Sequence, residues 1–146
     1  MKSKKILILC FVMILFAFNS GSVYAQTITI TITLTSRTAN TGHGILEYSP
    51  IGLSQEIYFD PRTPLTTGTY TGEVSRMDSR NRDGIIIYGN GLSASRGIFI
   101  HYGQYNNDWS QGCIILEVNG FNAMYRHLRN SVGMNGRVTI VIRDLS

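Results

Sequence analysis

The feature that most constrains the fold is a strict alternation of Ile or Leu with Thr over residues 26–35, which read QTITITITLT. Successive side chains of a β-strand point to opposite faces, so a period of two places the apolar residues on one face and the threonines on the other. The β-branched residues also favour extended backbone. The pattern therefore predicts a half-buried strand and indicates a domain that is mainly β.

Further short strands are expected along the first half of the chain, because runs of β-forming residues alternate there with turn residues. Residues 75–84 (SRMDSRNRDG) are polar and are predicted to form a solvated loop. The other expected segments are a turn at 38–44, strands at 45–48 and 55–59 around a turn at 49–52, a proline-rich loop at 60–64, and a strand at 66–74.

When the first 25 residues are left aside, the most apolar part of the chain lies in its second half. Residues 85–88, 97–102 and 112–116 are continuously hydrophobic, which predicts strands buried on both faces at the centre of the domain. In residues 119–132 the apolar side chains recur every three or four positions, which predicts one amphipathic helix ended by Gly133. A last strand, edge or central, is expected at 136–144.

The first 25 residues have the pattern of a secretory signal peptide. Three lysines within the first five residues precede an apolar run at 6–18, and Val23 and Ala25 place small residues before a cleavage site. We expect residues 1–25 to be removed and 26–146 to form a single domain, exported to the periplasm or the extracellular space, with no stable membrane anchor after cleavage.

The charge of the chain depends on this leader. The chain has 13 basic and 9 acidic residues, but residues 26–146 have no lysine and keep ten arginines, so their net charge is +1. Nucleic-acid binding normally requires a clustered basic face. None is visible in the sequence, so we expect no nucleic-acid partner, and we expect a monomer.

One cysteine remains after the leader is removed. Cys10 lies in the apolar run of the leader, so Cys113 has no partner for an internal disulfide. It is therefore a buried small residue, an intermolecular bridge or a reactive thiolate. A reactive thiol needs a base and oxyanion donors nearby. The glycine turn at 110–113 and His101, at the end of an apolar strand, could supply them.

These residues resemble the active-site motif of the L,D-transpeptidase catalytic-domain family of the YkuD type. The similarity lies in the segment IFIHYG, followed by a loop and SQGCIIL, then by a helix and a strand in the family's order. Upstream, residues 64–70 (PLTTGTY) are similar to a family segment that leads into a strand. The resemblance covers residues 55–142 and implies a β-sandwich or barrel with one helix after the cysteine.

The resemblance also implies roles for individual residues. Cys113 matches the nucleophile and His101 the general base, and the turn residues Ser110 and Gly112 match those that support the oxyanion hole. Gln111 stands where the family has a second histidine.

Substrate contacts are implied for the loop between the two catalytic positions. Tyr102, Tyr105 and Trp109 would line the cleft. Ile115 replaces an arginine that commonly binds substrate, and Arg96 is a candidate to supply that positive charge.

The implied activity is acyl transfer on peptidoglycan stem peptides, ended either by an amine (transpeptidation) or by water (carboxypeptidase activity). Two other functions stay open: an exported β-domain that binds cell-wall glycan or peptide without catalysis, and a toxin-like hydrolase of wall peptides. The histidines and Cys113 do not have the spacing of metal ligands, so no metal and no cofactor are expected.

Overall fold

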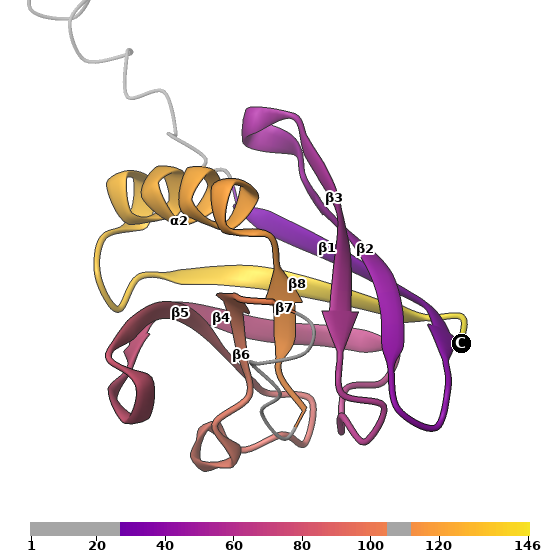
Figure 1. Cartoon of the computed structure of the whole chain (residues 1–146). Helices are drawn as coiled ribbons and strands as arrows, with labels where there is room; N and C mark the ends of the chain where they lie inside the picture. Colours follow the sequence, from indigo (N-terminus) through magenta and orange to yellow (C-terminus); the bar gives the residue numbers. More distant parts are fainter. Residues whose placement is uncertain (1–26, 105–111) are drawn as a thin grey trace, which may run out of the picture.

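The computed structural model describes residues 27–104 and 112–146 of the chain (Figure 1). Within these residues the secondary structure is mainly β with one α-helix, as the sequence predicts. The strands are β1 (Thr29–Arg37), β2 (Gly42–Tyr48), β3 (Leu53–Phe59), β4 (Gly68–Met77), β5 (Arg82–Tyr88), β6 (Phe99–Tyr102), β7 (Ile114–Leu116) and β8 (Arg137–Asp144). The helix is α2 (Val118–Val132), and short 3-10 turns lie at η1 (Ser49–Ile51), η2 (Asp78–Arg80) and η3 (Ala94–Arg96).

The eight strands of the described residues form a closed barrel in the order β1-β2-β3-β7-β6-β5-β4-β8. The pairs β1–β8 and β6–β7 are parallel, and the other pairs are antiparallel. The sequence did not decide whether the last strand is an edge strand or a central strand. In the structure it is central, because β8 lies between β1 and β4. Closure gives each of these strands a neighbour on both sides, although β3 pairs with β7 only through Tyr58 and Phe59.

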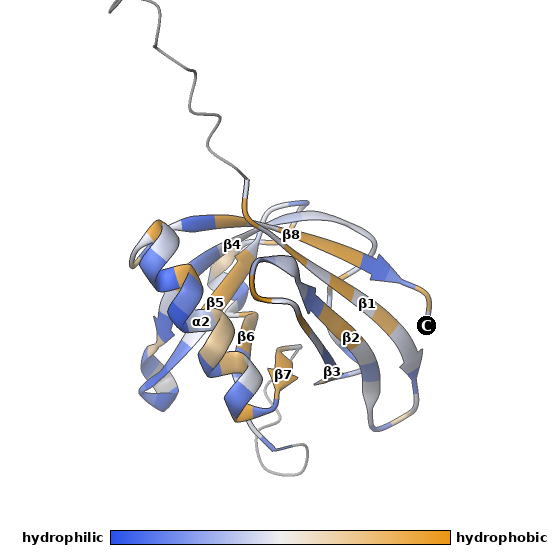
Figure 2. Cartoon of the chain, turned by 90° about the horizontal axis from the view of Figure 1, so that it is seen from above, coloured by the Kyte–Doolittle hydropathy of each residue, from blue (hydrophilic) through white to orange (hydrophobic). Residues whose placement is uncertain are grey.

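The alternating pattern of β1 is realised in the barrel wall. Ile30, Ile32 and Leu34 are fully buried in the interior, while Thr31 and Thr33 are half-buried on the outer face. Figure 2 shows the alternation of hydrophobic and more polar residues along β1. Burying one such aliphatic side chain stabilises a fold by about 1.5–3 kcal/mol, so the pattern fixes which face points inward.

The helix α2 packs its apolar stripe against the barrel. Phe121, Met124, Tyr125 and Leu128 are buried in the core cluster, and Val132 packs beside them. Glu117 caps the N-terminus, where its side chain accepts the Gly120 N–H. The helix predicted at 119–132 is therefore confirmed to within one residue. Within the described residues, no helix is long and apolar enough to cross a membrane.

Two local predictions are wrong. The polar segment 75–84 is mostly strand: β4 continues to Met77 and β5 begins at Arg82, with only the short turn η2 between them. The predicted turn at 38–44 is shorter than expected, because β2 begins at Gly42. Polar residues on the outer face of a barrel lose no burial energy, so their polarity does not exclude a strand.

Candidate functional site

The parallel pairing of β6 with β7 brings His101, on β6, near the segment of Cys113, which immediately precedes β7. His101 pairs with Ile115, and Cys113 lies two residues before Ile115. Because side chains alternate along a strand, Ile115 and Cys113 share the face of His101, while Ile100 and Ile114 point into the core cluster. The two residues expected to act together are thus offset by two positions, about 7 Å along the strand direction.

The Cys113 thiol is buried between the beginnings of these strands. The side chain is 2% exposed, and its sulfur accepts the Phe99 N–H at 3.3 Å. The S–H group points at the Gly97 carbonyl oxygen, with a sulfur–oxygen distance of 3.7 Å. These two contacts serve a structural role, because they connect β7 to the residues that lead into β6.

The imidazole of His101 is fully buried and held by a backbone carbonyl. Its Nδ1 lies 2.9 Å from the Tyr102 carbonyl oxygen, which can only accept a hydrogen bond. The neutral ring therefore carries its proton on Nδ1, and Nε2 is the basic nitrogen. This contact fixes the orientation of the imidazole.

Arg82 contacts the same carbonyl and was missed by the sequence analysis. Its Nη1 donates to the Tyr102 carbonyl oxygen at 2.9 Å, and its guanidinium lies 4.9 Å from the centroid of the Tyr102 ring. The Tyr102 carbonyl therefore accepts from both Arg82 and His101. The sequence placed Arg82 in a solvated loop, where nothing indicated that it would be half-buried beside the candidate site.

Gly112 forms the turn that leads into Cys113. Its φ of 100° lies in a region that favours glycine. Its carbonyl oxygen accepts the Thr63 hydroxyl at 2.8 Å, a buried hydrogen bond. The expected glycine turn is thus present at residue 112, but Ser110 and Gln111 lie outside the described residues. The oxyanion role of this turn stays a prediction.

We expect Gly112→Ala to destabilise the domain by about 2–4 kcal/mol. A Cβ at this position would meet Ile98 Cδ1 at 2.9 Å and Pro64 Cδ at 3.0 Å, in addition to the cost of the positive φ. Urea unfolding measures the change. Gly91→Ala is the matched control, because Gly91 has a φ of 81° and open space around it. Equal losses in the two variants would contradict the described packing of Gly112.

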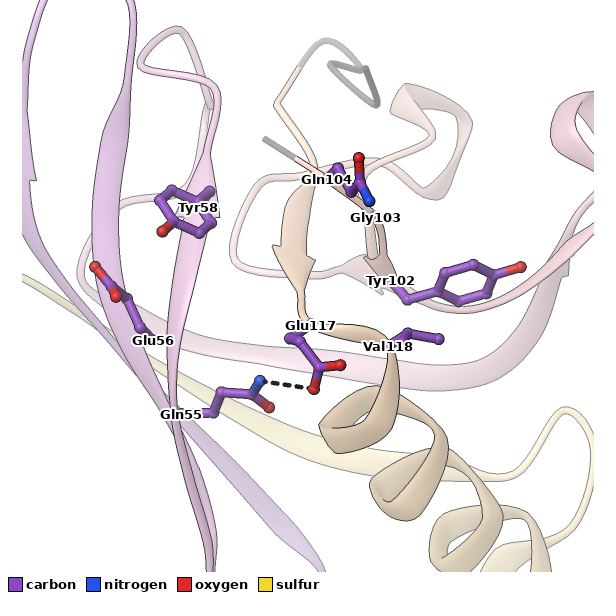
Figure 3. A pocket seen from close by; sticks show the side chains of 8 residues that line it. All are labelled: Gln55, Glu56, Tyr58, Tyr102, Gly103, Gln104, Glu117 and Val118. Carbon is purple, nitrogen blue, oxygen red and sulfur yellow. Dashed lines mark hydrogen bonds between the residues drawn. The ribbon is translucent and has the colours of Figure 1, made fainter. Parts of the chain in front are cut away.

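A pocket of about 690 Å³ lies next to the candidate pair, between β3 and the beginning of α2 (Figure 3). Its walls come from β3, from the end of β6 with the residues after it, and from the N-terminus of α2. The lining residues are Gln55, Glu56, Tyr58, Tyr102, Gly103, Gln104, Glu117 and Val118. Neither Cys113 nor His101 is among them.

The carboxylates of the pocket are held by neighbouring groups. Hydrogen bonds from the backbone N–H groups of Asn119 and Gly120 at the start of α2 lower the pKa of Glu117. Gln55 Nε2 donates to Glu117 Oε2 at 3.4 Å across the pocket (Figure 3). On β3, Glu56 Oε1 lies 3.3 Å from His43 Nδ1. Glu117 is thus held at the pocket wall, whereas the Glu56 carboxylate lies at the pocket margin, on the side of His43 and β2 (Figure 3).

A continuous row of outer-face residues connects the pocket to His101. Tyr58 pairs with His43 on one side and with Ile115 on the other, and Ile115 pairs with His101. The rings of His43 and Tyr58 make an edge-to-face contact with centroids 5.0 Å apart. Polar positions on β3 were visible in the sequence, but nothing local indicated that β3 lies beside β7.

The predicted substrate contacts are separated in the structure. Tyr102 lines the pocket, but its ring is directed away from Tyr58 and packs against Phe121, with centroids 5.7 Å apart (Figure 3). Arg96 is exposed on η3 and does not line the pocket. Tyr105 and Trp109 lie outside the described residues, as does the signal-peptide segment 1–25.

Comparisons with protein-family models, curated proteins and solved structures find no match to this chain. Among the described residues, no group of three or more His, Cys, Asp or Glu side chains is arranged to hold a metal ion.

Proposed function

We propose that the chain is an exported cysteine-dependent enzyme that acts on peptidoglycan stem peptides by L,D-transpeptidase- or L,D-carboxypeptidase-type acyl transfer. The observation that carries the proposal is the parallel register of β6 and β7, in which His101 pairs with Ile115, two residues after Cys113. The orientation of the imidazole by the Tyr102 carbonyl adds support, because it leaves Nε2 as the base.

The proposed reaction has two steps. The Cys113 sulfur attacks the carbonyl carbon of a stem peptide while His101 takes the thiol proton, and a C–S bond forms. The C–N bond then breaks, and His101 returns the proton to the leaving amine. In the second step, water or an acceptor amine attacks the thioester carbon and gives up a proton to His101. The C–S bond breaks, and His101 returns this proton to the Cys113 sulfur. Because the thiol is 2% exposed, the first step requires local opening around residue 113.

The first experiment identifies products. The protein comprising residues 26–146 is incubated with purified muropeptides, and the products are analysed by mass spectrometry. We expect either stems shortened by a terminal D-residue or cross-linked dimers, and protein alkylated at Cys113 is the control without activity. Shortened stems alone would indicate a carboxypeptidase or a toxin-like hydrolase, whereas dimers would indicate transpeptidation. Unchanged muropeptides would reject the enzyme proposal.

A non-catalytic domain that binds wall peptides is the second candidate. It is favoured by one observation: the pocket of about 690 Å³ is lined by neither Cys113 nor His101. Under this function, muropeptides bind in the pocket with no change in their mass, and replacement of Cys113 leaves their affinity unaltered.

A further inference from the structure

We infer that an extended peptide carrying a basic group binds by adding a strand to the open edge of β3, along residues 53–57. If this peptide is the substrate, the inference rests on the proposed function and describes how that substrate is held. The binding mode itself requires no turnover and can be tested separately.

The edge is open because β3 is much longer than the strand beside it. β3 pairs with β2 through all seven of its residues, but with β7 only through Tyr58 and Phe59. Within residues 27–104 and 112–146, no strand pairs with residues 53–57 on the side opposite β2. Figure 1 shows this part of β3 extending past β7 beside α2. Backbone groups of alternate residues on such an edge can pair with another chain.

The pocket lies along this edge and has room for a peptide. Gln55, Glu56 and Tyr58 of β3 form one wall, and the opposite wall includes Glu117 and Val118 at the beginning of α2. Its volume of about 690 Å³ falls within the range of about 300–1,000 Å³ that is typical of ligand sites. Strand addition is a recurring mode of peptide recognition, in which main-chain hydrogen bonds supply affinity and side-chain pockets supply specificity.

The charge of the pocket identifies the kind of peptide. Glu56 and Glu117 both line it, and among the described residues its lining includes no arginine or lysine. The Glu56 side chain is 63% exposed, so a ligand can reach it. Glu117 is ionised at neutral pH, as glutamates ordinarily are, and hydrogen bonds lower its pKa further. An extended peptide with an ammonium or guanidinium group complements these charges.

The direction of the edge connects this binding mode to the candidate pair. A peptide that follows β3 towards Tyr58 reaches the row in which Tyr58, Ile115 and His101 are neighbours. Cys113 immediately precedes β7, two residues before Ile115 and about 7 Å from this row. Because β7 occupies the edge at Tyr58 and Phe59, a substrate would leave the edge at that point and pass over the outer face of β7 to bring its scissile peptide bond to Cys113.

The test uses a pentapeptide with a central lysine and blocked termini, titrated into the Cys113→Ser protein by calorimetry. The peptide is then N-methylated at one backbone position at a time. Strand addition points alternate N–H groups at β3, so we expect about tenfold weaker binding for every second position and little change between them. Equal effects at all positions, or no binding of the parent peptide, would overturn the inference.

Charge is tested with a matched pair of variants. Glu56→Gln is expected to weaken binding of the lysine peptide about three- to fivefold, because the lost interaction is partly exposed. Glu47→Gln, an exposed carboxylate on the neighbouring strand β2, should leave the affinity unchanged. Equal affinity of a peptide with a central glutamate would overturn the assigned charge preference. If the effects of N-methylation alternate along the peptide but the protein leaves muropeptides unchanged, the enzyme proposal is rejected and the binding mode is retained.

Discussion

Cys113→Ser is expected to abolish turnover of muropeptides while the variant unfolds at nearly the urea concentration of the wild type. A serine hydroxyl is a much weaker nucleophile than a thiolate without dedicated activation. Its oxygen can nevertheless accept the Phe99 N–H and donate to the Gly97 carbonyl, the two contacts that seat the sulfur. The measurements are product analysis by mass spectrometry and urea unfolding followed by circular dichroism.

Cys113→Ala separates the catalytic from the structural role of this residue. Alanine removes the acceptor of the buried Phe99 N–H, so the variant should lose about 1–3 kcal/mol of stability that serine retains. Turnover by Cys113→Ser at the rate of the wild type would show that the thiol is structural only.

His101→Asn is a second variant whose muropeptide turnover is measured in the same way. The asparagine amide can replace the donor to the Tyr102 carbonyl but cannot act as a base, so we expect turnover to fall about 10²- to 10⁴-fold. His127→Asn is the matched control, because His127 is likewise hydrogen-bonded, to the Tyr48 hydroxyl, but lies on α2. An equal loss in both variants would contradict a specific role for His101.

Phe121→Ala is expected to cost about 3–5 kcal/mol of unfolding free energy, which is a large part of the stability of a domain of this size. The ring is fully buried, stacks on Tyr125 with centroids 5.4 Å apart, and contacts the Tyr102 ring. Its removal leaves a cavity between α2 and the barrel, because neither the helix nor the closed wall can collapse onto the space.

Urea unfolding measures the effect, and Asn122→Ala is the control. Asn122 is exposed on the same helix, so its replacement should change stability by less than about 0.5 kcal/mol. A loss below about 1 kcal/mol for Phe121→Ala would contradict the packing of α2 on the barrel. Because Phe121 also supports Tyr102, whose carbonyl orients His101, turnover should fall more steeply than the folded fraction.

The fold was predictable where the sequence has a clear local period. The threonine alternation identified β1, and the spacing of Phe121, Met124, Tyr125 and Leu128 identified α2 with its buried face. The segment 75–84 was wrongly predicted because a strand on the outer wall of a barrel can be polar. The parallel pairing of β1 with β8 has no local signal, since it depends on closure of the whole barrel.

The candidate site was predictable only in part. The sequence indicated Cys113, His101 and the turn at Gly112, and the structure brings their elements together. It could not indicate Arg82, whose contact with the Tyr102 carbonyl depends on the pairing of β5 with β6. The pocket along β3 could not be predicted either, because it arises from the different lengths of β3 and β7, which are far apart in sequence.

The parallel pairing of β1 with β8 has a consequence for the order in which the protein folds. Thr29 pairs with Thr139, 110 residues later in the chain. The barrel wall therefore cannot close during synthesis until β8 has left the ribosome, and the emerging chain stays open. If the chain is exported as proposed, this delay keeps it in a form that can be threaded through a narrow channel, and stable folding waits for arrival on the far side.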